Sequence, residues 1–283
     1  MRRKCFAVLS ALLLSAAALF TGIPAQAQNP AHRVGNIYYS SGYAGWQATV
    51  ISGNTATGAG VSIIVALPGA GGSGVTLADG SVVAITSVFN TSTPILVNDA
   101  NAETVTPSGV SVGPCPGGNV GASQNCITVT GTFNNTHGQS ALVTSGDQGI
   151  QEAITDAGAS GGGLVFWIAD TGVVTLNTGG LTTTTTTKVP TNFYNMGAAA
   201  RVTTAITVTA SWAVGISGAT GIFCSANSTL TLGTTCLANQ AAPASTGTTS
   251  ALTAVLITGA TGNPGAGAVK ARVWGWTPVQ PAS

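Results

Sequence analysis

The sequence predicts a mainly β protein made of two antiparallel β-sandwich-like domains joined by a single helix–strand segment. Hydrophobic residues make up 44% of the chain, which is enough apolar surface to build a core. Charged residues make up only 5%, so the outer faces of the sheets must be rich in Thr, Ser and Asn. Short β-branched runs recur between Gly, Pro and Asn clusters, which is the pattern of strands separated by turns.

The first 27 residues have the layout of a secretory signal peptide. Three basic residues at positions 2–4 precede an apolar run over 6–20, and small residues follow up to Ala27. The apolar run is shorter than the roughly 20 residues that a membrane-spanning helix requires. We therefore predict cleavage after Ala27 and a secreted protein, extracellular or periplasmic, with no membrane span in its mature form.

Removal of the signal peptide changes the charge balance. Five bases then remain against seven acids, so the formal charge falls from +1 to −2. All seven acids lie in residues 28–170, whereas residues 171–283 hold four bases and no acid. Four scattered bases do not make the clustered basic face that neutralises phosphates, so nucleic acid is excluded as a partner.

The mature chain holds four cysteines, an even number in a compartment that permits disulfides. Three pairings are possible, and we predict Cys115 with Cys126 and Cys224 with Cys236, because each pair brackets a short loop-like segment. A zinc site is the alternative, but these spacings lack the close pairs typical of zinc knuckles. No metal site is predicted.

The N-terminal portion reads as one antiparallel β domain over residues 28–143. Strands are expected at Val61–Leu67, Val82–Phe89 and Cys126–Phe133. The breaks between them contain glycines, which supply the positive φ angles that tight turns require.

One helix is predicted, over Gln148–Ala157, with Ser145 or Asp147 as its N-cap. The apolar residues on one of its faces have the i, i+4, i+7 spacing of an amphipathic helix. A glycine cluster ends it, and Leu164–Ile168 then reads as a buried strand. We assign residues 144–180 to a connector made of this helix and strand.

This segment resembles a known family. Asp147–Ile154, followed by Gly161–Phe166, is similar to the entry of right-handed parallel β-helix proteins of the pectate-lyase type, in which an amphipathic helix caps the first coil. The similarity stops at Ala169–Val173, where the usual continuation of the first coil is missing, and no repeat near 20–25 residues follows. No residue of this chain inherits the catalytic groups of those enzymes.

The C-terminal portion begins after a low-complexity boundary. Residues 181–189 contain six consecutive threonines and are assigned to a Thr-rich linker, with an extended strand as the alternative. Strands at Ile206–Val214, Ala251–Thr258 and Ala268–Trp276 then predict a β-sandwich domain over residues 190–283.

A search for catalytic groups gives no convincing set. His32 is expected in a frayed tail, and His137 is the only plausible base, with Asp147 or Asp170 to orient it. Residues 215–219 resemble a nucleophile elbow only superficially and are interpreted as a turn. Glu152 and Asp156 lie one helical turn apart, which more often indicates a solvated surface than paired catalytic acids. We predict no catalytic residue, no enzyme activity and no cofactor.

The best-defined candidate for a binding site is the last strand. There, the side chains of Lys270, Arg272, Trp274 and Trp276 alternate with small or apolar residues. One face of this strand is therefore basic and aromatic, which suits stacking on sugar rings and pairing with acidic substituents. The alternative, favoured by the usual burial of aromatics in strands, is that both indoles fill the core together with Trp212.

Three functions remain open at this point. The first is a non-catalytic secreted or cell-surface protein, structural or adhesive, that binds polysaccharide or a cell-surface glycan through its C-terminal domain. The second, which the resemblance implies, is a polysaccharide lyase or glycoside hydrolase. The third is a phage tail or capsid-like component, which shares the β-rich composition but does not suit a signal peptide.

Overall fold

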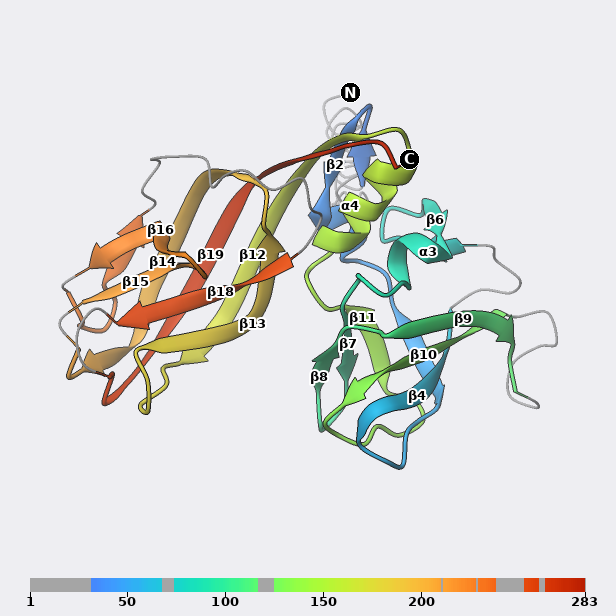
Figure 1. Ribbon diagram of the computed structural model, residues 1–283, viewed down its shortest axis with the longest axis horizontal. Helices are drawn as coiled ribbons and strands as arrows, with labels where there is room; N and C mark the ends of the chain where they lie inside the picture. The colour runs from blue at the N-terminus through green and yellow to red at the C-terminus, as the bar shows by residue number, and fades with distance from the viewer. Residues whose placement is uncertain are drawn as a thin grey trace, which may run out of the picture.

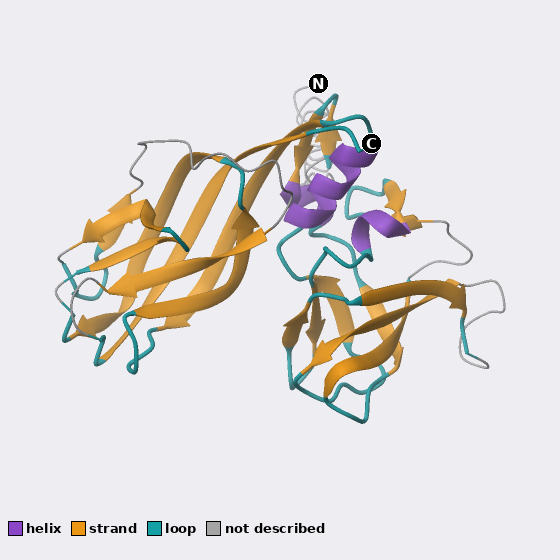
Figure 2. Cartoon of the chain, in the orientation of Figure 1, coloured by secondary structure: helices purple, strands orange, loops and turns teal. Residues whose placement is uncertain are grey.

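The structure is a computed structural model that describes residues 32–67, 74–116, 125–209, 211–227, 229–237, 252–259 and 263–282. The predicted signal peptide, residues 1–27, lies outside the described residues. The chain is mainly β, with 58% strand and 8% helix, and its sheets form two bodies with a group of short helices between them at one end (Figures 1 and 2). The mainly β class is confirmed.

The N-terminal body is a curled, seven-stranded antiparallel sheet. Its strand order is β8 (Glu103–Val105), β7 (Ile95–Asn98), β11 (Leu142–Ser145), β3 (Ala48–Ser52), β4 (Gly58–Ala66), β10 (Asn125–Phe133) and β9 (Gly109–Pro114). The sheet curls until β8 approaches β10, where an added Cβ on Gly131 would lie 2.6 Å from Val105. The expected N-terminal sandwich is therefore a half-barrel formed by one sheet, beside a small hairpin of β5 (Gly74–Thr76) and β6 (Val82–Ala84).

The C-terminal body has two sheets that face each other (Figure 1). The larger sheet has the order β1 (Arg33–Val34), β2 (Ile37–Tyr39), β12 (Gly163–Thr175), β19 (Ala266–Val279), β14 (Tyr194–Thr207) and β17 (Thr235–Leu237). The smaller sheet has the order β13 (Thr182–Pro190), β18 (Leu252–Gly259), β15 (Trp212–Ile216) and β16 (Ala219–Asn227). Trp167, Phe193 and Phe223 form a chain of ring contacts between them.

Two assignments between the domains were wrong. The threonine run expected as a linker is β13, which pairs with β18 along residues 182–190. The strand expected in the connector is β12, which lies in the middle of the larger sheet between β2 and β19. Its partner β2 comes from the N-terminal end of the chain and runs parallel to it, so this sheet is mixed.

Two predicted strands are interrupted. Of Val82–Phe89, only the first residues are extended, and α3 (Ile85–Val88) follows, with Ile85 and Val88 buried. Of Ile206–Val214, the middle is a turn between β14 and β15, where Val208 has a φ of 76° and is largely exposed. The other strands predicted from apolar runs are present.

The predicted helix is present as α4 (Ile150–Ala159), which packs between β12 and the short helices α2 (Ser40–Tyr43) and α3. Its N-cap is Gly149, so the prediction of Ser145 or Asp147 as N-cap was wrong, although both side chains bond backbone N–H groups at the start of the helix. Asp147 accepts hydrogen bonds from the backbone N–H groups of Ile150 and Gln151, and the Ser145 hydroxyl accepts one from Gly149. These bonds satisfy donors that a helix start leaves without partners.

Both predicted disulfides are present. Cys115–Cys126 joins the neighbouring strands β9 and β10 at the ends that flank their connection. Cys224–Cys236 joins β16 of the smaller sheet to β17 of the larger one, so it fastens the two layers of the C-terminal body together. Two disulfides indicate an oxidising compartment, which agrees with export.

Candidate functional site

The candidate residues of the last strand lie on the outer side of the larger C-terminal sheet. Residues that alternate with them along β19 are buried, including Val269, Ala271 and Val273. Lys270 and Arg272 are exposed, and both tryptophans are half-buried. The expectation that Trp274 and Trp276 fill the core is therefore wrong, because the core positions of this strand belong to the opposite face.

Neighbouring strands extend this face with further aromatic and apolar side chains. In the strand register, Trp276 lies between Phe166 of β12 and Tyr194 of β14, and Phe166 lies beside Tyr39 of β2. The ring centroids of Phe166 and Trp276 are 4.9 Å apart. We call this set the aromatic face, and its members are Tyr39, Phe166, Ile168, Tyr194, Trp274 and Trp276.

Trp274 lies across the backbone of Gly197, its neighbour on β14. A Cβ added to Gly197 would be 2.6 Å from Cε2 and 2.8 Å from Nε1 of the indole, so only glycine leaves room for the ring. Three atoms of one ring at such short range show that the indole lies over the strand. Trp274 is half-buried, so part of the indole remains open to solvent and to a ligand that stacks on it.

One end of the aromatic face is charged. Asp170 of β12 accepts hydrogen bonds from Nε and Nη2 of Arg272, at 3.2 and 2.8 Å, and lies 3.6 Å from the Lys270 ammonium. Burial raises the pKa of Asp170, but the Gly172 N–H and the two cations outweigh it, so the pKa lies below its ordinary value. Asp170 is therefore a fixed anion that orients Arg272.

The sequence located only one strand of this site. Tyr39, Phe166 and Tyr194 were missed, because they come from strands whose pairing with β19 spans most of the chain. Phe166 was read as part of a buried strand, whereas its side of β12 is half-exposed and only its neighbours Val165 and Trp167 are fully buried. Residues 164–168 are an unbroken apolar run, so the sequence carries no signal of which side of this strand faces outward.

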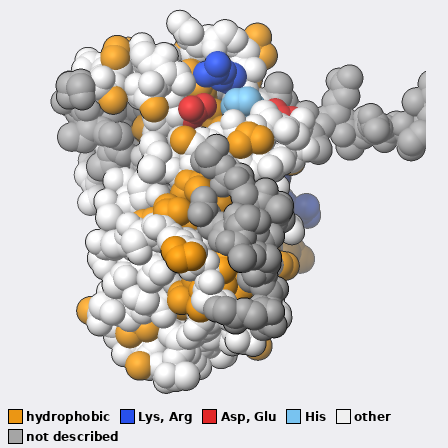
Figure 3. All heavy atoms as spheres, turned by 90° about the vertical axis from the view of Figure 1, so that its right-hand side faces the viewer, with side chains coloured by type: hydrophobic (Ala, Val, Ile, Leu, Met, Phe, Trp, Pro, Cys, Tyr) orange, Lys and Arg blue, Asp and Glu red, His pale blue; other side chains and the backbone are white. Residues whose placement is uncertain are grey.

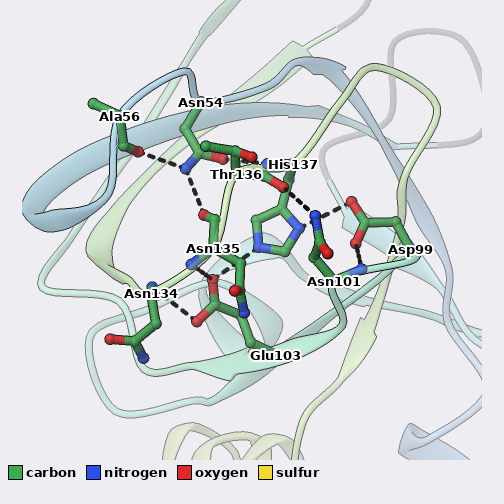
Figure 4. A network of polar contacts seen from close by, with 9 residues as sticks. All are labelled: Asn54, Ala56, Asp99, Asn101, Glu103, Asn134, Asn135, Thr136 and His137. Atoms are coloured by element: carbon green, nitrogen blue, oxygen red, sulfur yellow. Dashed lines mark hydrogen bonds and ion pairs between the residues drawn. The ribbon is translucent and has the colours of Figure 1, made fainter.

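A second polar cluster surrounds His137, at the closed end of the half-barrel (Figure 4). Its Nδ1 lies 3.0 Å from Oδ2 of Asp99 and its Nε2 lies 2.9 Å from Oε1 of Glu103, while its side chain is completely buried. The expected partners, Asp147 and Asp170, lie elsewhere in the fold. His137 thus meets two acids, but neither is one that the sequence indicated.

The two carboxylates of this cluster are held in the ionised form. Burial raises the pKa of Asp99, but bonds from the Asn101 N–H and from the His137 ring outweigh it, so the pKa is lowered. The pKa of Glu103 is lowered in the same way, against burial, by the Asn134 and Asn135 N–H groups and by His137.

Both ring nitrogens of His137 lie within hydrogen-bonding distance of a carboxylate, and the ring is completely buried. The imidazole is therefore enclosed by its two acids and does not face open solvent. The backbone of His137 is fixed as well, because its N–H donates to Oδ1 of Asn54. An added Cβ on the adjacent Gly53 would collide with the His137 carbonyl. The cluster joins β7, β8 and the loop after β10, and its geometry is that of a structural clamp.

His32 also has polar partners, contrary to the frayed tail expected for it. Its Nδ1 lies 3.1 Å from Oδ2 of Asp79 and 3.0 Å from the Ser81 hydroxyl. A catalytic triad needs the serine and the acid on different nitrogens of the ring. Here both partners share Nδ1, and Ser81 also donates to Asp79, so the arrangement orders the chain near its start.

Glu152 lies in the first turn of α4 on the buried side of the helix, which corrects the expectation of a solvated surface. It is completely buried, and its Oε1 accepts a hydrogen bond from Trp46 Nε1 at 3.1 Å. Burial raises the pKa of Glu152 well above its ordinary value, and the charge of Asp147 raises it further. Because Asp147 already accepts two backbone N–H bonds, Glu152 is the member of this pair that holds a proton.

A cleft of about 660 Å³ lies between α3, α4 and the end of β19. Its walls carry amide and hydroxyl side chains such as Asn90, Gln151 and Asn192 beside Ile154 and Val279, and none of its lining residues is charged. The face in Figure 3 has the same character, with few charged side chains, most of them near one end beside a histidine. An uncharged wall offers no acid or base.

Within the described ranges, no group of three or more His, Cys, Asp or Glu side chains is placed to hold a metal ion. No helix among these residues is long and apolar enough to cross a membrane. Comparisons of the chain with protein-family models, with curated proteins and with solved structures found no match.

Proposed function

We propose that this protein is a non-catalytic protein of the cell surface or extracellular space that adheres to polysaccharide through the aromatic face. The observation that carries the proposal is the placement of Trp274, whose indole lies against Gly197 on the outer side of the sheet and is half-exposed. Trp276, Phe166 and Tyr194 continue the same surface across three strands. Flat aromatic surfaces bind sugar rings by stacking, and each stacked ring contributes roughly 0.5–1.5 kcal/mol.

The arrangement of the other functional groups favours binding over catalysis. His137 has both ring nitrogens bonded to carboxylates, and Glu152 is sealed in the core. The half-exposed aromatic side chains and the exposed basic ones are instead gathered on the outer side of one sheet. This supports the adhesive hypothesis over the lyase or hydrolase hypothesis.

The experiment is co-sedimentation with a panel of insoluble polysaccharides, comparing wild type with Trp274→Ala/Trp276→Ala. Loss of two stacking contacts is expected to weaken retention by roughly tenfold or more. Val112→Ala is the control, because Val112 is 49% exposed and lies on the other body. Equal retention of wild type and the tryptophan variant would refute the proposal.

Fluorescence gives a test that does not depend on a variant. The protein has five tryptophans, of which Trp46, Trp167 and Trp212 are at most 1% exposed. A quencher in solution therefore reports mainly on Trp274 and Trp276. Protection from acrylamide quenching on addition of a retained polysaccharide is expected, and unchanged quenching would contradict binding at this face.

A further inference from the structure

We infer that the polysaccharide bound at the aromatic face is acidic and carries carboxylate groups, as in a polyuronate. This inference rests on the proposed function and adds the chemical class of the ligand. It follows from the charges at the end of the aromatic face, which β19 and β14 place together.

Three of the five bases in the described part of the chain lie on this one surface. They are Arg201, Lys270 and Arg272, whereas Arg33 and Lys188 lie elsewhere. All three are exposed, and Asp170 is the acid that pairs with two of them. The end of the face therefore has a net charge of about +2.

The position of Arg201 is the decisive detail. It lies directly opposite Lys270 in the ladder between β14 and β19, so two like charges share one cross-strand position. Like charges directly opposite each other destabilise a strand pair. Asp170 is 3.6 Å from Lys270 but already bonds Arg272 more closely, and Arg201 has no ion pair with an acid of the described residues. An anionic ligand would relieve this repulsion.

The charged and aromatic groups follow one line along β19. Trp276, Trp274, Arg272 and Lys270 point to the same side at every second residue, so the line is about 20 Å long at roughly 3.3 Å per residue. A linear polymer lying along it stacks on the indoles with one part and places acidic groups beside the cations with the next. A small anion would use only one end.

The test compares alginate, a polyuronate, with the same polymer after reduction of its carboxyl groups, in affinity electrophoresis at low and at physiological salt. At low salt, wild type is expected to bind alginate about fivefold to tenfold more tightly than it binds the reduced polymer, because two partly exposed ion pairs contribute about that much affinity. The preference should shrink as salt screens the charges.

Arg201→Gln/Lys270→Gln is the test variant, since both side chains are exposed and neither contributes to the core. It should lose the preference for alginate and keep the affinity for the reduced polymer. Arg33→Gln/Lys188→Gln is the matched control, because it also removes two positive charges, both of them away from the aromatic face. It should behave as wild type.

The outcomes separate the two proposals. Equal binding of alginate and reduced alginate by wild type would overturn the acidic ligand and leave the adhesive function standing. Retention of neither polymer would overturn both. Tighter binding of single-stranded DNA than of alginate would also overturn the inference, because the face would then recognise nucleic acid.

Discussion

Replacement of Glu152 by glutamine is expected to remove a loss of stability that the wild type undergoes as pH rises. The side chain is completely buried, and its one hydrogen bond, from Trp46, can be kept by the amide oxygen of glutamine. The other oxygen, Oε2, has no hydrogen-bond partner in the described residues. The substitution therefore changes the ionisation of the site while leaving its shape and its main contact in place.

The sign follows from the raised pKa of Glu152. In the unfolded chain the carboxyl loses its proton near its usual value of 4.5, whereas the folded protein keeps the proton to a much higher pH. The stability contributed by the protonated form is complete below pH 4.5 and decreases as pH rises above it. Each pH unit in that window costs the wild type about 1.4 kcal/mol relative to the glutamine variant.

The assay is urea unfolding of wild type and Glu152→Gln at pH 5, 6 and 7. The difference in the free energy of unfolding should move in favour of the variant by about 2–3 kcal/mol across this range. Glu103→Gln is the control, because the lowered pKa of Glu103 predicts the opposite trend, a contribution lost as pH falls. Parallel curves for wild type and Glu152→Gln would refute the buried protonated carboxyl.

Two further predictions concern the clamps of the fold. His137→Ala leaves Asp99 and Glu103 without their shared partner, so it should lower the free energy of unfolding at pH 7 by about 3 kcal/mol. In urea unfolding, this loss should become smaller as pH falls below 4, because the two carboxylates are then protonated; a loss that does not change with pH would contradict the clamp. Replacing Cys224 and Cys236 with serine removes the link between the two sheets and should cost about 2–3 kcal/mol, measured as a lower urea midpoint; a midpoint equal to that of wild type would show that the layers do not depend on it.

Local patterns predicted most strands and the helix correctly, because the chemistry that sets them lies within a few residues. Val61–Leu67 and Cys126–Phe133 alternate or run apolar between glycines, and both are strands. Ser145 and Asp147 indicated where α4 starts, although the N-cap itself is Gly149. Both disulfides followed from the same reasoning, since each joins strands that flank one connection.

Several of the wrong assignments involve partners that are distant in sequence. The threonine run of 182–187 has no apolar periodicity, and only its pairing with β18, about seventy residues later, makes it a strand. Asp99 and Glu103 lie 38 and 34 residues from His137, a spacing that carries no motif. The aromatic face is built from four neighbouring strands, β2, β12, β19 and β14, which are far apart in the sequence.

The scarcity of charge connects the fold to the proposed site. Each of the seven acids is engaged by a nearby donor: Asp79 by His32, Asp99 and Glu103 by His137, Asp147 by the start of α4, Glu152 by Trp46, Asp156 by Tyr43 and Asp170 by Arg272. Glycoside cleavage needs two carboxyl groups that face a substrate, and these acids instead serve the structure. Among the described residues, three of the five bases lie beside the aromatic face with one acid, so the electrostatic attraction that this protein can offer an anionic ligand is strongest where its exposed rings are.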